Sequence, residues 1–281
     1  MNARREAVVV LVAYKPELSP LERISVDRCL EVLQRHPIVV VAPEGLALPS
    51  PLDRLPVERF APSFFTGIAA YSSLLLSRDF YRRFIAFRYM LIHQLDVFVF
   101  KDELSEWCAR GYDYIGAPWI GEDWPNKVET RQGLPFWIRS RLFRFLKPLD
   151  HRVGNGGFSL RRVDTMIQAL TVLRRTRRAW GGRNEDGFWS VAVPECWWWR
   201  YRVPQVNEAM EFAFETNPST LFEQTGKRLP FGCHAWERCN PEFWHPHFVA
   251  AGHPFDLAQV QAMVRRERPS ERHKKGSRSC R

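Results

Sequence analysis

Carboxylates and a histidine stand at three points of the sequence where the surrounding residues are apolar. Asp96 lies inside MLIHQLDVFVF, and His234 lies inside LPFGCHAWE. Glu185 and Asp186 are separated by one glycine from an apolar Phe-Trp pair in NEDGFWS. A carboxylate among apolar side chains is unfavourable unless a cation or a hydrogen-bond donor compensates it. These points are therefore the first candidates for a binding or catalytic site.

Each point also has a purely structural interpretation. Asn184 could cap a helix whose first turn favours the acidic pair that follows it. A lone histidine such as His234 is more often packed or hydrogen-bonded than a ligand. Interpreted as chemistry, one carboxylate of Glu185 and Asp186 could accept a proton from an attacking hydroxyl group. The glycine cluster GNGG lacks the spacing of the known phosphate-binding loops, so by itself it indicates only a turn.

The elements before Asp96 follow a strand–helix–strand pattern. The β-branched run at 7–14 is typical of a buried strand, and residues 19–36 have helical apolar spacing with Ser19 as N-cap and Glu22 at the capping-box position. A second buried strand is predicted at 37–43. Parallel strands of this hydrophobicity indicate a sheet that is covered on both faces.

Further elements continue the α/β pattern. We expect a helix at 67–84 and a buried strand at 88–100, followed by a short helix, a turn and an extended segment within 102–120. The segment 153–170 predicts a glycine-rich turn before an amphipathic helix. Ligands of open parallel sheets bind beyond the carboxyl ends of the strands, which is where Asp96 is expected.

The charge distribution separates a folded part from a tail. The formal net charge is +10, and the tail at 265–281 contributes eight Lys and Arg residues against two Glu residues, which leaves +4 for the rest. We expect one domain over 1–264, with a mobile loop or insertion at 121–152, and a disordered basic tail that could contact DNA or an anionic membrane. The basic cluster at 174–178 could be a solvated helix end.

The composition points to the cytoplasm. No apolar run reaches the roughly 18 residues that a membrane-spanning helix needs, and the N-terminal residues do not resemble a signal peptide. The six cysteines form no CxxC pair and are expected to be reduced thiols.

Six blocks in a fixed order carry a family resemblance: YKP, HQLDVFVF, YDYIGAPW, VGNGGFSLRR, NEDGFWS and FGCHAW. From about Val8 to about Trp244 the chain resembles a bacterial and phage-associated family labelled a domain of unknown function, whose members look like GT-A type glycosyltransferases. The resemblance implies a single GT-A-like, Rossmann-related α/β domain with a mostly parallel central sheet flanked by helices. It also implies the transfer of a sugar from a nucleotide-sugar donor to a hydroxyl acceptor.

In GT-A enzymes an acidic DXD motif binds a divalent cation that holds the donor's diphosphate. Gln94 occupies the first acidic place of that motif here and Asp96 the second, so the resemblance implies that Asp96 faces the metal and that Gln94 contributes only a neutral side chain. His234 matches a late histidine that completes the coordination. Imidazole suits Mn²⁺ better than Mg²⁺, so Mn²⁺ is expected, with Mg²⁺ as the alternative.

The same resemblance implies how the donor is bound. Tyr14 would stack on the nucleotide and Lys15 would contact it by charge. Asn155 would hydrogen-bond sugar hydroxyls, and Gly156 and Gly157 would let the backbone approach the donor closely. A UDP-sugar is the expected donor.

For the acceptor side, the resemblance places the catalytic base of an inverting reaction in NEDGFWS. Asp186 is the first choice and Glu185 the second. Trp119, Phe158 and Trp189 are expected to contact the acceptor. That acceptor is expected to be a saccharide or lipid-linked saccharide in cell-surface polysaccharide synthesis, which would place the protein in the cytoplasm or at the inner membrane face.

Two other functions remain open at this stage. The same chemistry could glycosylate a hydroxymethylated DNA base, with the basic tail following the phosphates. Alternatively, the chain could be a carbohydrate-binding module that kept the fold and lost catalysis, an interpretation that Gln94 favours. The combined presence of Asp96, Asp186 and His234 favours an enzyme.

Overall fold

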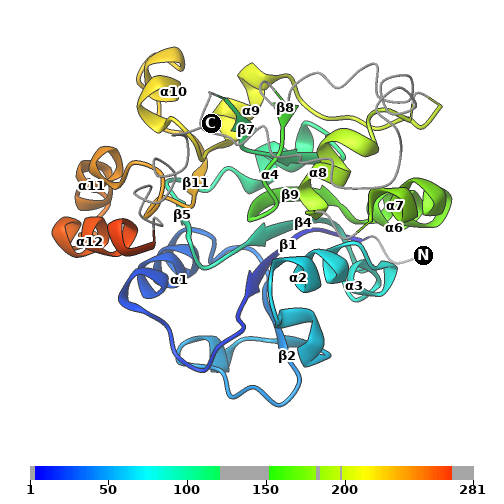
Figure 1. Ribbon diagram of the computed structural model, residues 1–281, viewed down its shortest axis with the longest axis horizontal. Coiled ribbons are helices and arrows are strands. Elements are labelled where there is room, and N and C mark those ends of the chain that lie inside the picture. Colours follow the sequence, from blue (N-terminus) through cyan, green and yellow to red (C-terminus); the bar gives the residue numbers. More distant parts are fainter. Residues whose placement is uncertain (1–3, 121–151, 182–183, 197, 268–281) are drawn as a thin grey trace, which may run out of the picture.

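The computed structural model describes residues 4–120, 152–181, 184–196 and 198–267. Its main sheet has six strands in the order β3-β2-β1-β4-β9-β6 (Figure 1). Strands β3, β2, β1 and β4 are parallel, and β9 is antiparallel to both of its neighbours. The sequence prediction of an α/β domain with a mostly parallel sheet is confirmed. The strands of this sheet are β1 (Arg5–Val12), β2 (Ile38–Pro43), β3 (Val57–Phe60), β4 (Phe87–His93), β6 (Tyr114–Gly116) and β9 (Phe158–Arg162).

Helices cover both faces of this sheet, as parallel strands require. Alternate residues of β1 point to opposite faces, so that Val9 and Leu11 pack toward α1 and α4 while Val8 and Val10 pack toward α2, α3 and α6. The helices of the two layers and their continuations are α1 (Pro20–Val32), α2 (Ile68–Leu75), α3 (Arg78–Arg82), α4 (Leu104–Ala109), α6 (Val163–Val172), α7 (Arg174–Trp180), α8 (Glu185–Gly187) and α9 (Val206–Phe212). Short helical turns are η1 (Leu52–Arg54), η2 (Pro62–Phe65) and η3 (Phe188–Ala192).

A second sheet, in the order β10-β11-β5, lies beside the first. It consists of β5 (Val97–Val99), β10 (Ala213–Phe214) and β11 (Gly232–His234), with β5 antiparallel to β11. Aromatic residues join this sheet to α10 (Pro218–Gln224), α11 (Pro241–Ala250) and α12 (Leu257–Glu267). A two-stranded ribbon pairs β7 (Pro118–Trp119) with β8 (Arg152–Val153).

The structure corrects three sequence predictions. The strand expected at 88–100 is two strands of different sheets, and Asp96 lies in the turn between β4 and β5. The helix expected at 67–84 is divided into α2 and α3, because the Ser77 side chain caps a new helix by accepting a hydrogen bond from the Phe80 amide. Helix α12 extends three residues into the tail that was expected to be disordered.

The capping box of α1 and the free thiols agree with the sequence predictions, whereas strand β9 lies at Phe158–Arg162, where only a turn and a helix were expected. Ser19 caps α1, its hydroxyl oxygen accepts a hydrogen bond from the Glu22 amide, and the Glu22 carboxylate accepts one from the Ser19 amide. Within the described ranges every cysteine is a free thiol, and no helix has the length and apolar character to cross a membrane. The loop predicted at 121–152 and the tail from 268 onward lie, apart from Arg152, outside the described residues.

Phe158 joins the two sheets. Its ring is stacked 5.1 Å from that of Phe212 and lies 5.3 Å from that of Phe231, and all three are fully buried. A Cβ atom at Gly232 of β11 would lie only 2.6 Å from the Phe158 ring. The close approach of β9 to β11 therefore depends on this ring and this glycine.

We expect Phe158→Ala to lower the free energy of unfolding by about 3–5 kcal/mol, because it leaves a cavity between the sheets. Urea denaturation would measure the change. Val249→Ala, at a half-exposed position of α11, is the control and should change stability by less than about 1 kcal/mol. A similar small effect at Phe158 would show that the ring does not join the sheets.

Candidate functional site

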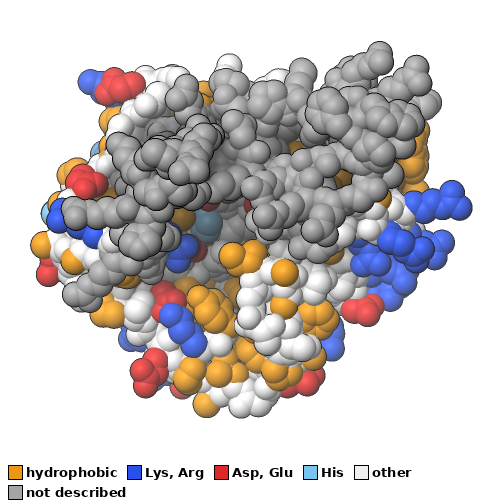
Figure 2. Space-filling view, in the orientation of Figure 1, with side chains coloured by type: hydrophobic (Ala, Val, Ile, Leu, Met, Phe, Trp, Pro, Cys, Tyr) orange, Lys and Arg blue, Asp and Glu red, His pale blue; other side chains and the backbone are white. Residues whose placement is uncertain are grey.

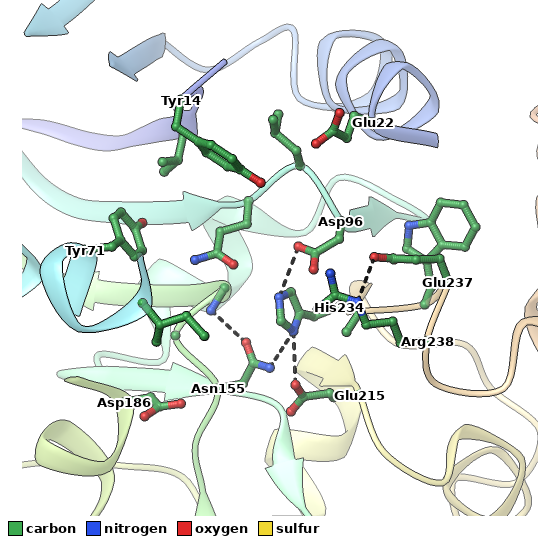
Figure 3. Close-up of a pocket in the computed structure, with 18 of the residues that line it drawn as sticks. Tyr14, Glu22, Tyr71, Asp96, Asn155, Asp186, Glu215, His234, Glu237 and Arg238 are labelled. Atoms are coloured by element: carbon green, nitrogen blue, oxygen red, sulfur yellow. Dashed lines mark hydrogen bonds and ion pairs between the residues drawn. The ribbon is translucent and has the colours of Figure 1, made fainter. Parts of the chain in front are cut away.

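A cavity of about 780 Å³ opens at the carboxyl ends of β1 and β4, between the two sheets (Figure 3). This is the edge at which α/β sheets bind ligands. The cavity brings together ten residues that were expected to bind the donor or the metal or to act as the base: Tyr14, Lys15, Gln94, Asp96, Asn155, Gly156, Gly157, Glu185, Asp186 and His234.

The turn that carries Asp96 is fixed by backbone hydrogen bonds from both sheets. The Gln94 amide donates to the Gly157 carbonyl (2.9 Å), and the Ala235 amide donates to the Asp96 carbonyl (2.9 Å). Gly157 directly precedes β9, and Ala235 directly follows β11. The two hydrogen bonds therefore tie the turn between β4 and β5 to both sheets and place Asp96 beside His234.

His234 lies between two carboxylates. Its Nε2 is 3.2 Å from Asp96 Oδ1, and its Nδ1 is 3.1 Å from Glu215 Oε1. Burial lowers the pKa of His234, but the two carboxylates outweigh burial and hold it well above its usual range. Burial correspondingly raises the pKa of Asp96, and the attraction of His234 outweighs it, so this pKa is lowered. The three groups therefore form a partly buried ionic cluster.

Asp96 and His234 carry an oxygen and a nitrogen donor of the types that divalent cations bind. Nε2 of His234 has no hydrogen-bond partner, although it lies 3.2 Å from Asp96 Oδ1. Two ligands at about 2.1 Å from one cation and at right angles to each other are about 3 Å apart, so this spacing fits a shared cation. Glu215 would then accept a hydrogen bond from the other ring nitrogen, as carboxylates behind metal-bound histidines do. Within the described ranges, no three His, Cys, Asp or Glu residues form a complete ligand group.

Asn155 and the following glycines lie against the histidine. The Asn155 side-chain oxygen accepts hydrogen bonds from the Gly157 and Phe158 amides (2.8 and 3.1 Å), and its side-chain nitrogen is 2.7 Å from His234 Nδ1. A Cβ atom at Gly157 would lie 2.1 Å from His234 Nε2. The glycine is therefore required for the approach of β9 to His234, a contact within the protein that the sequence did not reveal.

The adjacent acidic residues differ in their surroundings. Glu185 is buried and paired with the fully buried Arg161 (Oε1 to Nη2, 2.8 Å), and a Cβ atom at Gly156 would lie 2.2 Å from the same Oε1. Asp186 lines the cavity, where its Oδ1 accepts a hydrogen bond from the Gly187 amide. Burial, followed by repulsion from Glu185, raises the pKa of Asp186 to about 7. Glu185 is thus held by the fold, whereas Asp186 is poised to exchange a proton.

Tyr14 and Lys15 lie at the cavity wall that follows β1. Tyr14 is 52% exposed, which leaves its ring open to a ligand. Lys15 forms an ion pair with Glu22 of α1 (2.8 Å). Its ammonium group is therefore already partly neutralised.

The three residues expected to contact an acceptor do not line the cavity. Trp119, Phe158 and Trp189 are each buried to 1% exposure or less. A Cβ atom at Gly154 would lie 2.2 Å from the Trp119 ring, which shows how tightly that ring is packed. The sequence prediction for these residues is corrected, because their apolar surroundings are those of the core.

Several cavity residues were not predicted. Glu215 follows the apolar residues of β10, as Asp96 follows β4, and this shared pattern could have identified it. Glu237 and Arg238 follow the FGCHAW block, and burial raises the pKa of Glu237 to about 7. Buried polar atoms without a hydrogen-bond partner include Tyr71 Oη, Glu215 Oε2 and Glu237 Oε2, and all three residues line this cavity. Such atoms are normally satisfied by a ligand or by water.

The mostly parallel main sheet carries the cavity at the carboxyl ends of β1 and β4, and solved glycosyltransferases have a similar α/β fold. The fold is similar to that of mouse xyloside xylosyltransferase 1 in its apo form (TM-score 0.50, 11% identity, 82% of this chain and 97% of that one). It is also similar to the apo structure of the bifunctional glycosyltransferase WbbM (TM-score 0.51, 13% identity, 93% of this chain and 52% of that one), of which it spans about half. No curated protein matches the sequence. Residues 54–234 match the family described as protein of unknown function (DUF5672), and the chain belongs to that family.

Asp186 leads to a prediction about stability and pH. Because its pKa is raised to about 7, the folded protein retains this proton to a higher pH than the unfolded chain does. Stability should therefore fall as the pH rises from about 4 to about 7. Asp186→Asn removes this effect, so its melting temperature should exceed that of the wild type by an amount that grows over this pH range.

Circular dichroism during heating, at a series of pH values, would test this expectation. Asp102→Asn is the matched control. Hydrogen bonds from His36 and Arg35 outweigh burial and lower the pKa of Asp102, so its stabilising effect is present above pH about 4 and is lost in acid. Asp102→Asn should therefore be less stable than the wild type at neutral pH. A pH-independent difference for Asp186→Asn would contradict the environment assigned to Asp186.

Removing the charge of Glu185 should lower the stability of the protein, whereas removing that of Asp186 should raise it. Glu185→Gln leaves the buried Arg161 guanidinium without its counter-charge, so we expect the free energy of unfolding to fall by about 3–5 kcal/mol. Urea denaturation of both single variants at neutral pH would compare them. Unchanged stability in Glu185→Gln would show that the ion pair does not hold this segment.

Proposed function

We propose that the protein is a glycosyltransferase that moves a sugar from a nucleotide-sugar donor, most simply a UDP-sugar, to a hydroxyl group of a saccharide or lipid-linked saccharide. The observation that carries this proposal is the arrangement of the cavity. A partly buried cluster suited to a cation and a diphosphate lies in the same cavity as a carboxylate suited to accept a proton.

The donor would lie with its diphosphate toward Asp96 and His234. A divalent cation held by Asp96 and His234, Mn²⁺ or Mg²⁺, would neutralise charge on the diphosphate. Arg238 from the segment after β11 lies in the same cavity and adds positive charge on that side. Tyr14 is available for stacking on the base, since half of its surface is exposed.

Asp186 would act as the general base. Its carboxylate takes the proton of the acceptor hydroxyl, whose oxygen forms a bond to the anomeric carbon. The bond from that carbon to the phosphate oxygen breaks, and its electron pair leaves with the nucleoside diphosphate. Direct displacement of this kind inverts the configuration at the anomeric carbon. Glu185 does not take part, because Arg161 holds it.

A non-catalytic sugar-binding protein is the second candidate, and Gln94 in the first place of the acidic motif is the observation that favours it. Such a protein would have no need of a carboxylate whose pKa lies near 7. A DNA base as acceptor has weaker support, because no contact among the described residues favours it. Binding of donor without hydrolysis or transfer would favour the sugar-binding protein.

The decisive experiment measures binding and hydrolysis of UDP-, GDP-, CMP- and TDP-sugars, with and without Mn²⁺. We expect one donor to bind in a Mn²⁺-dependent manner, and Asp96→Ala to abolish that binding. Asp186→Asn should still bind the donor but should lower turnover by about 10²-fold or more, since it removes the base. Wild-type turnover should rise with pH and level off above about 7, as Asp186 loses its proton.

Asp102→Asn is the control, because Asp102 pairs with Arg35 and His36 and does not line the cavity. It should retain wild-type donor binding and turnover. Near-wild-type turnover of folded Asp186→Asn would show that another group is the base. Absence of donor binding across the panel would contradict the proposed function itself.

A further inference from the structure

The mouth of the cavity exposes apolar side chains. Ile68, at the start of α2, is 74% exposed, the largest value among the large hydrophobic residues of the described ranges, and it lines the cavity. Of the other exposed large hydrophobic residues, Tyr14 also lines the cavity, whereas Ile85 and Val249 do not. Figure 2 shows hydrophobic side chains gathered beside the central hollow of this face. Exposed apolar surface beside a ligand cavity indicates that the ligand is partly apolar.

The position of Ile68 assigns this surface to the acceptor side of the cavity. Helix α2 packs against α8, and Ser72 Oγ of α2 accepts a hydrogen bond from the Glu185 amide (3.4 Å), directly before Asp186. Figure 3 shows Tyr71 of α2 on the same side of the cavity as Asp186, opposite Glu237 and Arg238. Ile68 precedes Tyr71 by three residues and so lies on the same helix face.

The apolar residues continue before the helix. Phe65, at the end of η2, also lines the cavity, and Gly67, which lies between Phe65 and Ile68, carries no side chain. The segment Phe65–Ile68 therefore brings no charged group to this wall. The polar residues Asn155, Glu215 and His234 lie away from it, around the ionic cluster. The side chains of Phe65 and Ile68 offer a saccharide no hydrogen bond, whereas an alkyl or aryl group packed on them would remove apolar surface from water.

We propose that the acceptor carries an apolar group close to its reacting hydroxyl, and that this group packs against Ile68 and Phe65. This inference rests on the proposed glycosyl transfer and narrows its acceptor class to apolar glycosides, such as a lipid-linked saccharide or an aryl glycoside. Ile68 and Phe65 then replace the core residues Trp119, Phe158 and Trp189 as the acceptor-contacting side chains.

The test compares acceptors that share a sugar and differ only in the aglycone. Methyl, hexyl and phenyl glycosides of glucose, galactose, mannose and N-acetylglucosamine are offered with the identified donor, and their KM values and dissociation constants are measured. We expect the hexyl or phenyl glycoside of one sugar to have a KM about tenfold lower than its methyl counterpart, as burial of roughly half an isoleucine side chain allows. A preference for hexyl indicates a lipid, and a preference for phenyl indicates an aryl acceptor.

Ile68→Ser should remove this difference while leaving the methyl glycoside nearly unchanged, and Ile68→Leu should preserve it. Ile85→Ser is the matched control, because Ile85 is 44% exposed and lies outside the cavity lining. It should retain the full preference. Melting temperatures of the three variants would show that each is folded.

Donor hydrolysis without acceptor keeps this inference separate from the proposed function. If the donor is neither bound nor hydrolysed, the glycosyltransferase proposal fails. If the donor is hydrolysed but methyl, hexyl and phenyl glycosides bind equally, or none binds, the apolar acceptor is ruled out. A loss of donor hydrolysis in folded Ile68→Ser would also overturn it, because the residue would then serve the donor.

Discussion

The pairing of His234 with Asp96 and Glu215 is the interaction on which the arrangement of the site depends. The two carboxylates come from different strand ends, Asp96 after β4 and Glu215 after β10, while the histidine ends β11. Each carboxylate would be unfavourable alone in this environment. The three groups compensate one another only when the two sheets are packed together. The charge cluster and the packing of the sheets therefore stabilise each other.

Gly156 and Gly157, which follow Asn155, allow the close packing between the two sheets. Gly157 allows the backbone to pass beside His234, and Gly156 allows it to pass beside Glu185. Arg161 then donates hydrogen bonds to the Gly156 carbonyl, the Ser159 hydroxyl, the Tyr81 hydroxyl and the Glu185 carboxylate. A charged side chain that is fully buried thus fixes the segment that carries Asp186. Arg161 fixes Glu185, and the carboxylate of the next residue, Asp186, faces the cavity.

The sequence predicted the elements whose signal is local. The β-branched strands, the capping box of Ser19 and Glu22, and the placement of Asp96 at the ligand-binding edge all follow from spacing along the chain. The break between β4 and β5 was missed, because an apolar run interrupted by Gln94 and Asp96 has the composition of a single strand. Only the hydrogen bonds of Gly157 and Ala235, which are distant in sequence, define the turn.

The sequence predicted which residues line the cavity better than it predicted the role of each one. Aromatic residues beside the motifs suggested an acceptor surface, yet Trp119 and Trp189 are core, because burial depends on what the distant chain packs against them. Glu185 and Asp186 are neighbours with the same charge, and sequence alone ranks them only weakly. Arg161, 24 residues earlier, distinguishes them by neutralising one.

Gln94 has its own consequence for a cation at the site proposed above. Its neutral amide leaves Asp96 as the carboxylate that would meet the cation from the turn after β4, which weakens the attraction for that cation. Glu215 would add negative charge through His234, because a carboxylate that accepts a hydrogen bond from the second ring nitrogen makes the imidazole a stronger ligand. A cation at this site would therefore depend on the small sheet as much as on the acidic motif, and the two sheets would have to be assembled before it could bind.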